Sequence, residues 1–226
     1  MAEIIVALDL PSRDESLRWL DRAAGLRWVK VGSVLFTREG PGFVRELAGR
    51  GLQVFLDLKW HDIPNTVAGA VEGGRAIGAS MATIHTLGGR EMMRAAAAAA
   101  GPELGVVGVT VLTSHTGTTY GEATGRGVVD PEEEVRRQAR NAATAGLRGI
   151  VCSPHEIGAV RTVLPAGAWI VVPGIRRAGD AAGDQARVAG PADAARAGAT
   201  HLVVGRPLLQ AQDPAAAVRE FQEAAG

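Results

Sequence analysis

The chain has 226 residues, with 24 acidic and 24 basic side chains and therefore no formal net charge. This balance excludes the broad basic surface that binds nucleic acid or an anionic membrane, so an anionic ligand has to be held by a local site. The length favours one domain covering residues 1–226. The single cysteine, Cys152, excludes an internal disulfide framework and a cysteine-based zinc site, which favours a reducing cytoplasm.

The amino-terminal residues predict a strand. They contain neither a basic region nor a long apolar stretch, so we expect neither a signal peptide nor a membrane span there. Ile4–Leu10 is apolar apart from Asp9 near its end, and the pattern from Ser12 to Glu15 is a capping box that predicts the first helix. The second strand is predicted at Trp28–Gly32, where Lys30 interrupts an apolar run.

Strands and helices then alternate to the end of the chain. Helices are predicted at 41–49, 64–77, 91–100 and 191–197 and from residues 130 and 213, and strands at 53–59, 81–86, 105–112, 149–152, 169–172 and 201–204. The threonine- and glycine-rich segment from Thr113 to Gly127 predicts a mobile loop, and a second loop follows Arg176 through about Gly190.

This order predicts a single (β/α)8 TIM barrel, because about eight strand and helix pairs alternate over a length that such a barrel needs. A doubly wound sheet is the alternative. It would ordinarily carry a glycine-rich phosphate turn after the first strand, and Asp9-Leu-Pro-Ser12 is not such a turn.

Lysine is rare in this chain. Only Lys30 and Lys59 are lysine, so the other 24 − 2 = 22 basic residues are arginine. A compact ammonium can give up a proton, whereas a guanidinium cannot be deprotonated in proteins. Both lysines are therefore candidates for chemistry, with chance retention as the alternative.

The strand that starts at Gln53 ends in charged residues. Its two-residue side-chain period places Asp57 and Lys59 on the same face, and Asp62 follows in the loop before Pro64. Neighbouring carboxylates favour a charged ammonium, so we expect Lys59 to be protonated and to act as a proton donor. A surface ion-pair cluster is the alternative.

The charged residues converge at the carboxyl ends of the strands, which form the catalytic face of such barrels. Asp9, Lys30 and the Asp57–Lys59 pair come from the first three strands. A phosphate site is predicted across from them, because backbone N–H groups and forked arginines after the last two strands can hold a dianion. Its candidates are Arg176, Gln185, Gly205 and Arg206.

Three motifs resemble the bacterial orotidine 5′-monophosphate decarboxylase family: Asp57-Leu-Lys-Trp-His-Asp-Ile-Pro-Asn-Thr66, Val29-Lys-Val-Gly32 and Pro173-Gly-Ile-Arg176. The resemblance spans nearly the whole chain. It implies release of CO2 from a pyrimidine carboxylate to give uridine 5′-monophosphate, the last step of de novo pyrimidine synthesis, without metal or organic cofactor. The catalytic residues it implies are Lys59, Asp57, Lys30 and Asp62.

The same resemblance implies the substrate contacts and a partner. The contacts are Asp9, Lys30, Ile63, Thr66, Thr113, Pro173, Arg176, Gln185, Gly205 and Arg206. Thr113 rather than Ser114 is expected on the uracil side. A homodimer is implied, in which Asp62, Ile63 and Thr66 reach into the partner's site.

Two other functions stay open at this point. A related barrel group, which contains keto-gulonate phosphate decarboxylase and hexulose phosphate synthase, shares the Asp-x-Lys-x-x-Asp strand but uses magnesium. As the resemblance goes, the enzymes of that group have a glutamate that binds the metal at the position of Lys30. A lysine ammonium and a divalent metal ion repel each other, so Lys30 favours the metal-free enzyme. A barrel that binds a nucleotide phosphate without catalysis is the second alternative. The five histidines show no metal-ligand spacing.

Overall fold

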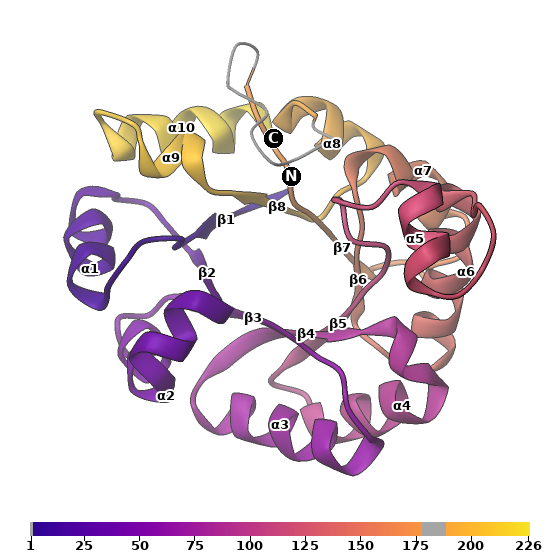
Figure 1. The fold of residues 1–226 in the computed structure, drawn as a ribbon. Coiled ribbons are helices and arrows are strands. Elements are labelled where there is room, and N and C mark those ends of the chain that lie inside the picture. The colour runs from indigo at the N-terminus through magenta and orange to yellow at the C-terminus, as the bar shows by residue number, and fades with distance from the viewer. Residues whose placement is uncertain (1, 178–188) are drawn as a thin grey trace.

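The structure is a closed barrel of eight parallel strands. The computed structural model describes residues 2–177 and 189–226. Each strand pairs with the next along the chain, and the last pairs with the first, which confirms the predicted (β/α)8 barrel (Figure 1). The strands are β1 Glu3–Ala7, β2 Trp28–Gly32, β3 Gln53–Trp60, β4 Ala79–His85, β5 Gly105–Val109, β6 Gly149–Val151, β7 Trp169–Val172 and β8 His201–Val204.

Helices surround the barrel in an outer ring (Figure 1). They are α1 Arg13–Arg22, α2 Ser33–Gly49, α3 Pro64–Ala76, α4 Gly89–Ala100, α5 Gly117–Ala123, α6 Pro131–Thr144, α7 Ile157–Arg161, α8 Pro191–Ala197, α9 Arg206–Leu209 and α10 Pro214–Ala224, with the short 3-10 turns η1 Thr86–Gly88 and η2 Pro154–Glu156. In the described part of the chain, no helix combines the length and the apolar character needed to cross a membrane.

The apolar core has two parts because alternate residues of each strand face opposite sides of the sheet. The larger part lies between the strands and the helices. The smaller part fills the barrel itself and consists of Ile5, Ala7, Trp28, Phe55, Met81, Val107, Val171 and Val203. Side chains two residues further along these strands therefore also face the interior, closer to the carboxyl ends.

Aromatic rings close the amino-terminal end of the barrel. Trp28, Trp169 and His201 are the first residues of their strands, and their rings contact one another edge to face at centroid distances of 5.0 to 6.1 Å. Burial, aided by the positive charges of Arg27 and Arg148, lowers the pKa of His201 to about 4. This ring is therefore neutral at pH 7.

Several predicted segments differ from the structure. The first strand ends at Ala7 rather than at Leu10, and the fifth ends at Val109 rather than at Leu112. The helix expected at 41–49 is only the second half of α2, which begins at Ser33 and is kinked where Gly40 adopts a φ of 66° before Pro41. The loop expected at 113–127 contains α5. Thr116 caps this helix by accepting a hydrogen bond from the backbone N–H of Thr119, so local capping forms a helix that has no apolar period.

Candidate active site

A cavity of about 500 Å³ opens at the carboxyl ends of the strands. Among the residues that line it are nine of those predicted from the sequence: Asp9, Lys30, Asp57, Lys59, Thr113, Pro173, Arg176, Gly205 and Arg206. They come from both sides of the barrel and meet only because the sheet closes. The predicted catalytic face and this cavity coincide.

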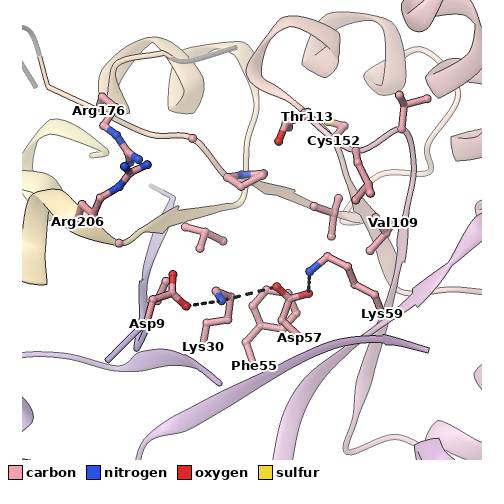
Figure 2. A pocket seen from close by; sticks show the side chains of 18 residues that line it. Asp9, Lys30, Phe55, Asp57, Lys59, Val109, Thr113, Cys152, Arg176 and Arg206 are labelled. Carbon is pink, nitrogen blue, oxygen red and sulfur yellow. Dashed lines mark hydrogen bonds and ion pairs between the residues drawn. The ribbon is translucent and has the colours of Figure 1, made fainter. Parts of the chain in front are cut away.

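Four charged side chains form a continuous row along one wall of the cavity (Figure 2). In this charged row, Lys30 Nζ donates to Asp9 Oδ1 at 3.2 Å and lies 3.8 Å from Asp57 Oδ2. Lys59 Nζ donates to Asp57 Oδ1 at 2.8 Å. Positive and negative groups therefore alternate in the order Asp9, Lys30, Asp57, Lys59, as expected from their strands.

Asp57 is the central acid of the charged row, and only 14% of its side chain is exposed. Burial alone raises the pKa of a carboxyl group, but the charges of Lys30 and Lys59 and hydrogen bonds from Lys59 and Thr83 outweigh it, so the pKa of Asp57 lies below its usual value. Asp57 is therefore an anion at neutral pH that faces two cations.

Gly32 leaves room for the charged row. A Cβ atom at this position would lie 2.9 Å from Lys30 Nζ and 3.9 Å from Asp9 Oδ1. Any side chain there would push the ammonium away from its two carboxylates, because 2.9 Å is shorter than a van der Waals contact. The glycine that follows Lys30 by two residues thus belongs to the construction of the site.

Lys59 is not in regular strand geometry. It has a φ of 53°, and it is the one non-glycine residue with a positive φ in the described part of the chain. Leu56 pairs with Ala82 and Trp60 with Ile84, so three residues of β3 span the interval that a single residue, Thr83, spans in β4. The predicted contact between Asp57 and Lys59 is confirmed, but it forms across a bulge rather than along a regular strand.

The guanidinium groups of Arg176 and Arg206 lie beside each other, on the side of the cavity opposite the charged row (Figure 2). Arg176 is buried, and its backbone N–H donates to Ala189 O at 3.0 Å, while Arg206 begins α9 and is separated from β8 by Gly205 alone. Gly174 has a φ of 79°, a conformation that glycine adopts readily, in the turn that leads from β7 to Arg176. This arginine pair provides forked donors suited to a phosphate dianion.

Three predicted residues do not line the cavity of their own chain. Asp62, Ile63 and Thr66 are exposed at the start of α3. The Asp62 side chain accepts a hydrogen bond from the backbone N–H of Ile63 at 2.6 Å, and Ile63 is 67% exposed. Gln185 lies outside the described residues.

The neighbours of the motif pack as follows. Trp60 turns away from the cavity and packs against the core beside Gly74 of α3. His61 and His85 lie with ring centroids 5.8 Å apart, and burial, together with His61 and Lys59, lowers the pKa of His85. Across residues 2–177 and 189–226, no three His, Cys, Asp or Glu side chains form a group that fits a metal ion.

The sequence reading missed the apolar surface of the cavity and one polar residue. Phe55 and Val203 line the cavity two residues before Asp57 and Gly205, and Cys152 lines it after β6. The two-residue period counted backward from each charged residue could have found the first two. Thr83 is fully buried beside Asp57, and a threonine inside an apolar strand gives no signal of such a contact.

Comparisons with known proteins agree with this geometry. Residues 2–221 match the model of the orotidine 5′-phosphate decarboxylase / HUMPS family. A protein from Opitutus terrae named orotidine 5′-phosphate decarboxylase is 51% identical over 97% of this chain and 96% of its own length. One of the same name from Anaeromyxobacter dehalogenans is 52% identical over 96% and 95%.

Solved structures give the same picture. The crystal structure of orotidine 5′-phosphate decarboxylase from Lactobacillus acidophilus superposes with a TM-score of 0.88 at 30% identity and covers 100% of both chains. An uncharacterized conserved protein from Geobacillus kaustophilus superposes with a TM-score of 0.85 at 34% identity, over 99% of this chain and 100% of that one. The chain therefore belongs to the orotidine 5′-phosphate decarboxylase / HUMPS family.

Proposed function

We propose that this chain is a carboxy-lyase that converts orotidine 5′-monophosphate to uridine 5′-monophosphate and CO2, the last step of de novo pyrimidine synthesis. The observation that carries the proposal is the charged row facing the arginine pair across one cavity. Relatives that carry the name of this activity at 51% and 52% identity support it. The enzyme acts in the cytoplasm as a homodimer of single-domain chains, without metal or organic cofactor.

The chemistry needs positive charge at the reacting carbon. When the bond to the carboxylate breaks, CO2 leaves and the electron pair stays on a ring carbon that has no adjacent carbonyl group to accept it. Lys59 stabilises this developing carbanion and then transfers a proton from Nζ to the same carbon. Asp57 accepts a hydrogen bond from Nζ and so orients the Lys59 ammonium. Asp57 also lies against the departing carboxylate.

The remaining contacts orient the nucleotide. Arg206, Arg176 and Gln185 hold the phosphate together with the backbone at Pro173 and Gly205, Thr113 meets the uracil ring, and Asp9 and Lys30 also contact the substrate. Lys30 and Asp62 in addition hold Lys59 in place. Binding energy from the phosphate, which does not react, is then realised in the transition state. Asp62, Ile63 and Thr66 of each chain complete the partner's site, which accords with their exposure in the single chain.

Lys30 argues against the magnesium-dependent reaction of the related barrel group. Its ammonium lies 3.2 Å from one carboxylate and 3.8 Å from another, which are the oxygen donors that a divalent ion would need. A cation already present between them repels a metal at that position. The family match alone covers both groups, so the position of Lys30 is the feature that favours the metal-free reaction.

The test is an absorbance assay with orotidine 5′-monophosphate, run with and without a chelator on the wild-type chain and the Lys59→Ala variant. We expect wild-type turnover to be unaffected by the chelator and the variant to lose about 10³-fold in kcat, while calorimetry shows that it still binds uridine 5′-monophosphate. Loss of wild-type turnover with the chelator would favour the magnesium enzymes. Tight nucleotide binding without CO2 release would favour a binding protein.

A further inference from the structure

One buried hydroxyl group fastens the bulge of β3 to β4. Thr83 Oγ1 donates to Asp57 Oδ1 at 3.0 Å and accepts from the backbone N–H of Lys59 at 2.8 Å. Thr83 has no exposed surface. This single oxygen therefore contacts the side chain of the central acid and the main chain of the adjacent lysine.

The backbone at Lys59 needs such support. Its φ of 53° lies in the left-handed region, which residues with a Cβ atom adopt rarely. At a bulge the ordinary ladder hydrogen bonds are interrupted, and here three residues of β3 face the single residue Thr83. The hydroxyl group replaces a ladder bond, since it accepts the N–H of Lys59 that no β4 carbonyl in regular register would accept.

The same hydroxyl fixes the carboxylate. Asp57 Oδ1 accepts hydrogen bonds from Lys59 Nζ at 2.8 Å and from Thr83, while Oδ2 faces Lys30. Two donors on one oxygen set the rotation of the carboxylate plane, and this rotation decides where the ammonium of Lys59 points. Thr83 thus acts on both ends of the Asp57 and Lys59 pair (Figure 2 shows the pair).

We propose that Thr83 is a positioning residue of the active site, whose hydroxyl group holds Lys59 in its left-handed conformation and Asp57 in the rotation that aims the Lys59 ammonium. Thr83 touches neither substrate nor the reacting carbon in this role, so its loss changes kcat rather than nucleotide affinity. The turnover part of the inference rests on the proposed decarboxylase function, whereas the geometric part does not.

Three variants test the proposal. Thr83→Val keeps the shape and removes the hydroxyl group, Thr83→Ser keeps the hydroxyl group, and Thr110→Val is the matched control. Thr110 is also buried at this end of the barrel, but its hydroxyl group donates to Val151 O at 2.8 Å and not to the charged row. Melting temperatures of all three identify any loss of folding.

We expect Thr83→Val to lower kcat about 10- to 100-fold with KM changed less than about threefold, because a small misplacement of a proton donor has this effect. Thr83→Ser should recover kcat to within about threefold of wild type, and Thr110→Val should stay in the same range. Equal kcat in Thr83→Val and wild type, or a change confined to KM, would overturn the proposal. So would a Thr83→Ser variant as slow as Thr83→Val.

A second readout does not require turnover. In protein labelled with ¹³C at aspartate carboxyl groups, NMR titration follows Asp57 directly. Loss of the Thr83 hydrogen bond removes one of the causes that lower the pKa of Asp57, so this pKa should rise in Thr83→Val and return toward the wild-type value in Thr83→Ser. An unchanged Asp57 titration refutes the positioning role even if the wild-type chain shows no decarboxylase activity, which would refute the proposed function alone.

Discussion

The ammonium of Lys30 lies 3.8 Å from Oδ2 of Asp57, on the opposite carboxylate oxygen from the one that Lys59 contacts. Lys30 is also the largest of the influences that lower the pKa of Asp57 against the opposing effect of burial. Lys30 thereby keeps Asp57 ionised without making the short hydrogen bond that Lys59 makes. The two lysines are therefore not equivalent, although they flank the same acid.

Lys30→Met should lower kcat about 100-fold and shift the acid limb of the kcat profile to higher pH. The shift follows because Asp57, without its first cation, has a raised pKa and is protonated at a higher pH than in wild type. Turnover measured from pH 5 to 8 tests this. Arg50→Met, which removes an exposed ion pair with Asp21, is the control, and an identical shift in both variants would contradict the assignment.

Arg206→Ala should weaken binding of uridine 5′-monophosphate about 100-fold and leave binding of uridine unchanged, because the arginine pair serves only the phosphate. Calorimetry with both ligands gives the comparison. Arg177→Ala is the matched control. Arg177 follows Arg176 in the chain, but its side chain pairs with Glu220 and stacks on Phe221, away from the cavity. Equal weakening for uridine and its phosphate would show that Arg206 does not hold the phosphate.

Mixed dimers test whether Asp62 serves the partner's site. Lys59→Ala and Asp62→Asn are each expected to be inactive alone, but a mixed dimer contains one site with both residues intact. Random exchange of subunits should therefore restore about a quarter of wild-type activity. Lys59→Ala mixed with Asp57→Asn is the control that should stay inactive, because both residues belong to the same chain's site. No recovery despite proven exchange would place Asp62 in its own site.

The fold should lose stability in acid through His201. The ordinary pKa of histidine is 6.5, and burial lowers the pKa of His201 to about 4 in the folded chain. The neutral ring therefore makes its full contribution to the unfolding free energy above pH 6.5, and this contribution is lost as the pH falls toward 4. At pH 4.5 the loss is about 2.5 kcal/mol of unfolding free energy. His201→Gln should remove this part of the pH dependence in urea titrations, whereas the exposed His155→Gln should not. Equal slopes for all three proteins would contradict the assignment.

Much of the barrel and of the charged row could be predicted because both depend on local regularities. The predicted segments at Trp28–Gly32, Trp169–Val172, His201–Val204 and Pro191–Ala197 agree with the structure, since apolar runs between turn residues define buried strands and helices well. Lys30 and Lys59 stood out because 22 of the 24 basic residues are arginine.

The features that could not be predicted depend on the register between neighbouring segments of the chain. The two-residue period gave the right neighbours for Asp57, but it cannot reveal the bulge at Lys59, which depends on how β3 and β4 align. Thr83 has no local signal for the same reason. The helix α5 was missed because it is held by the Thr116 cap rather than by an apolar face.

Both lysines lie in one cavity, where the side chain of Lys30 is 12% exposed and that of Lys59 is 36% exposed. No other lysine occurs in the sequence, so the outer surface offers no side-chain amine. Reagents that acylate or cross-link amines, which usually label a protein at random, therefore address this chain at its amino terminus and at Lys59. Attachment through lysine to a dye or a resin will block the cavity instead of leaving it open.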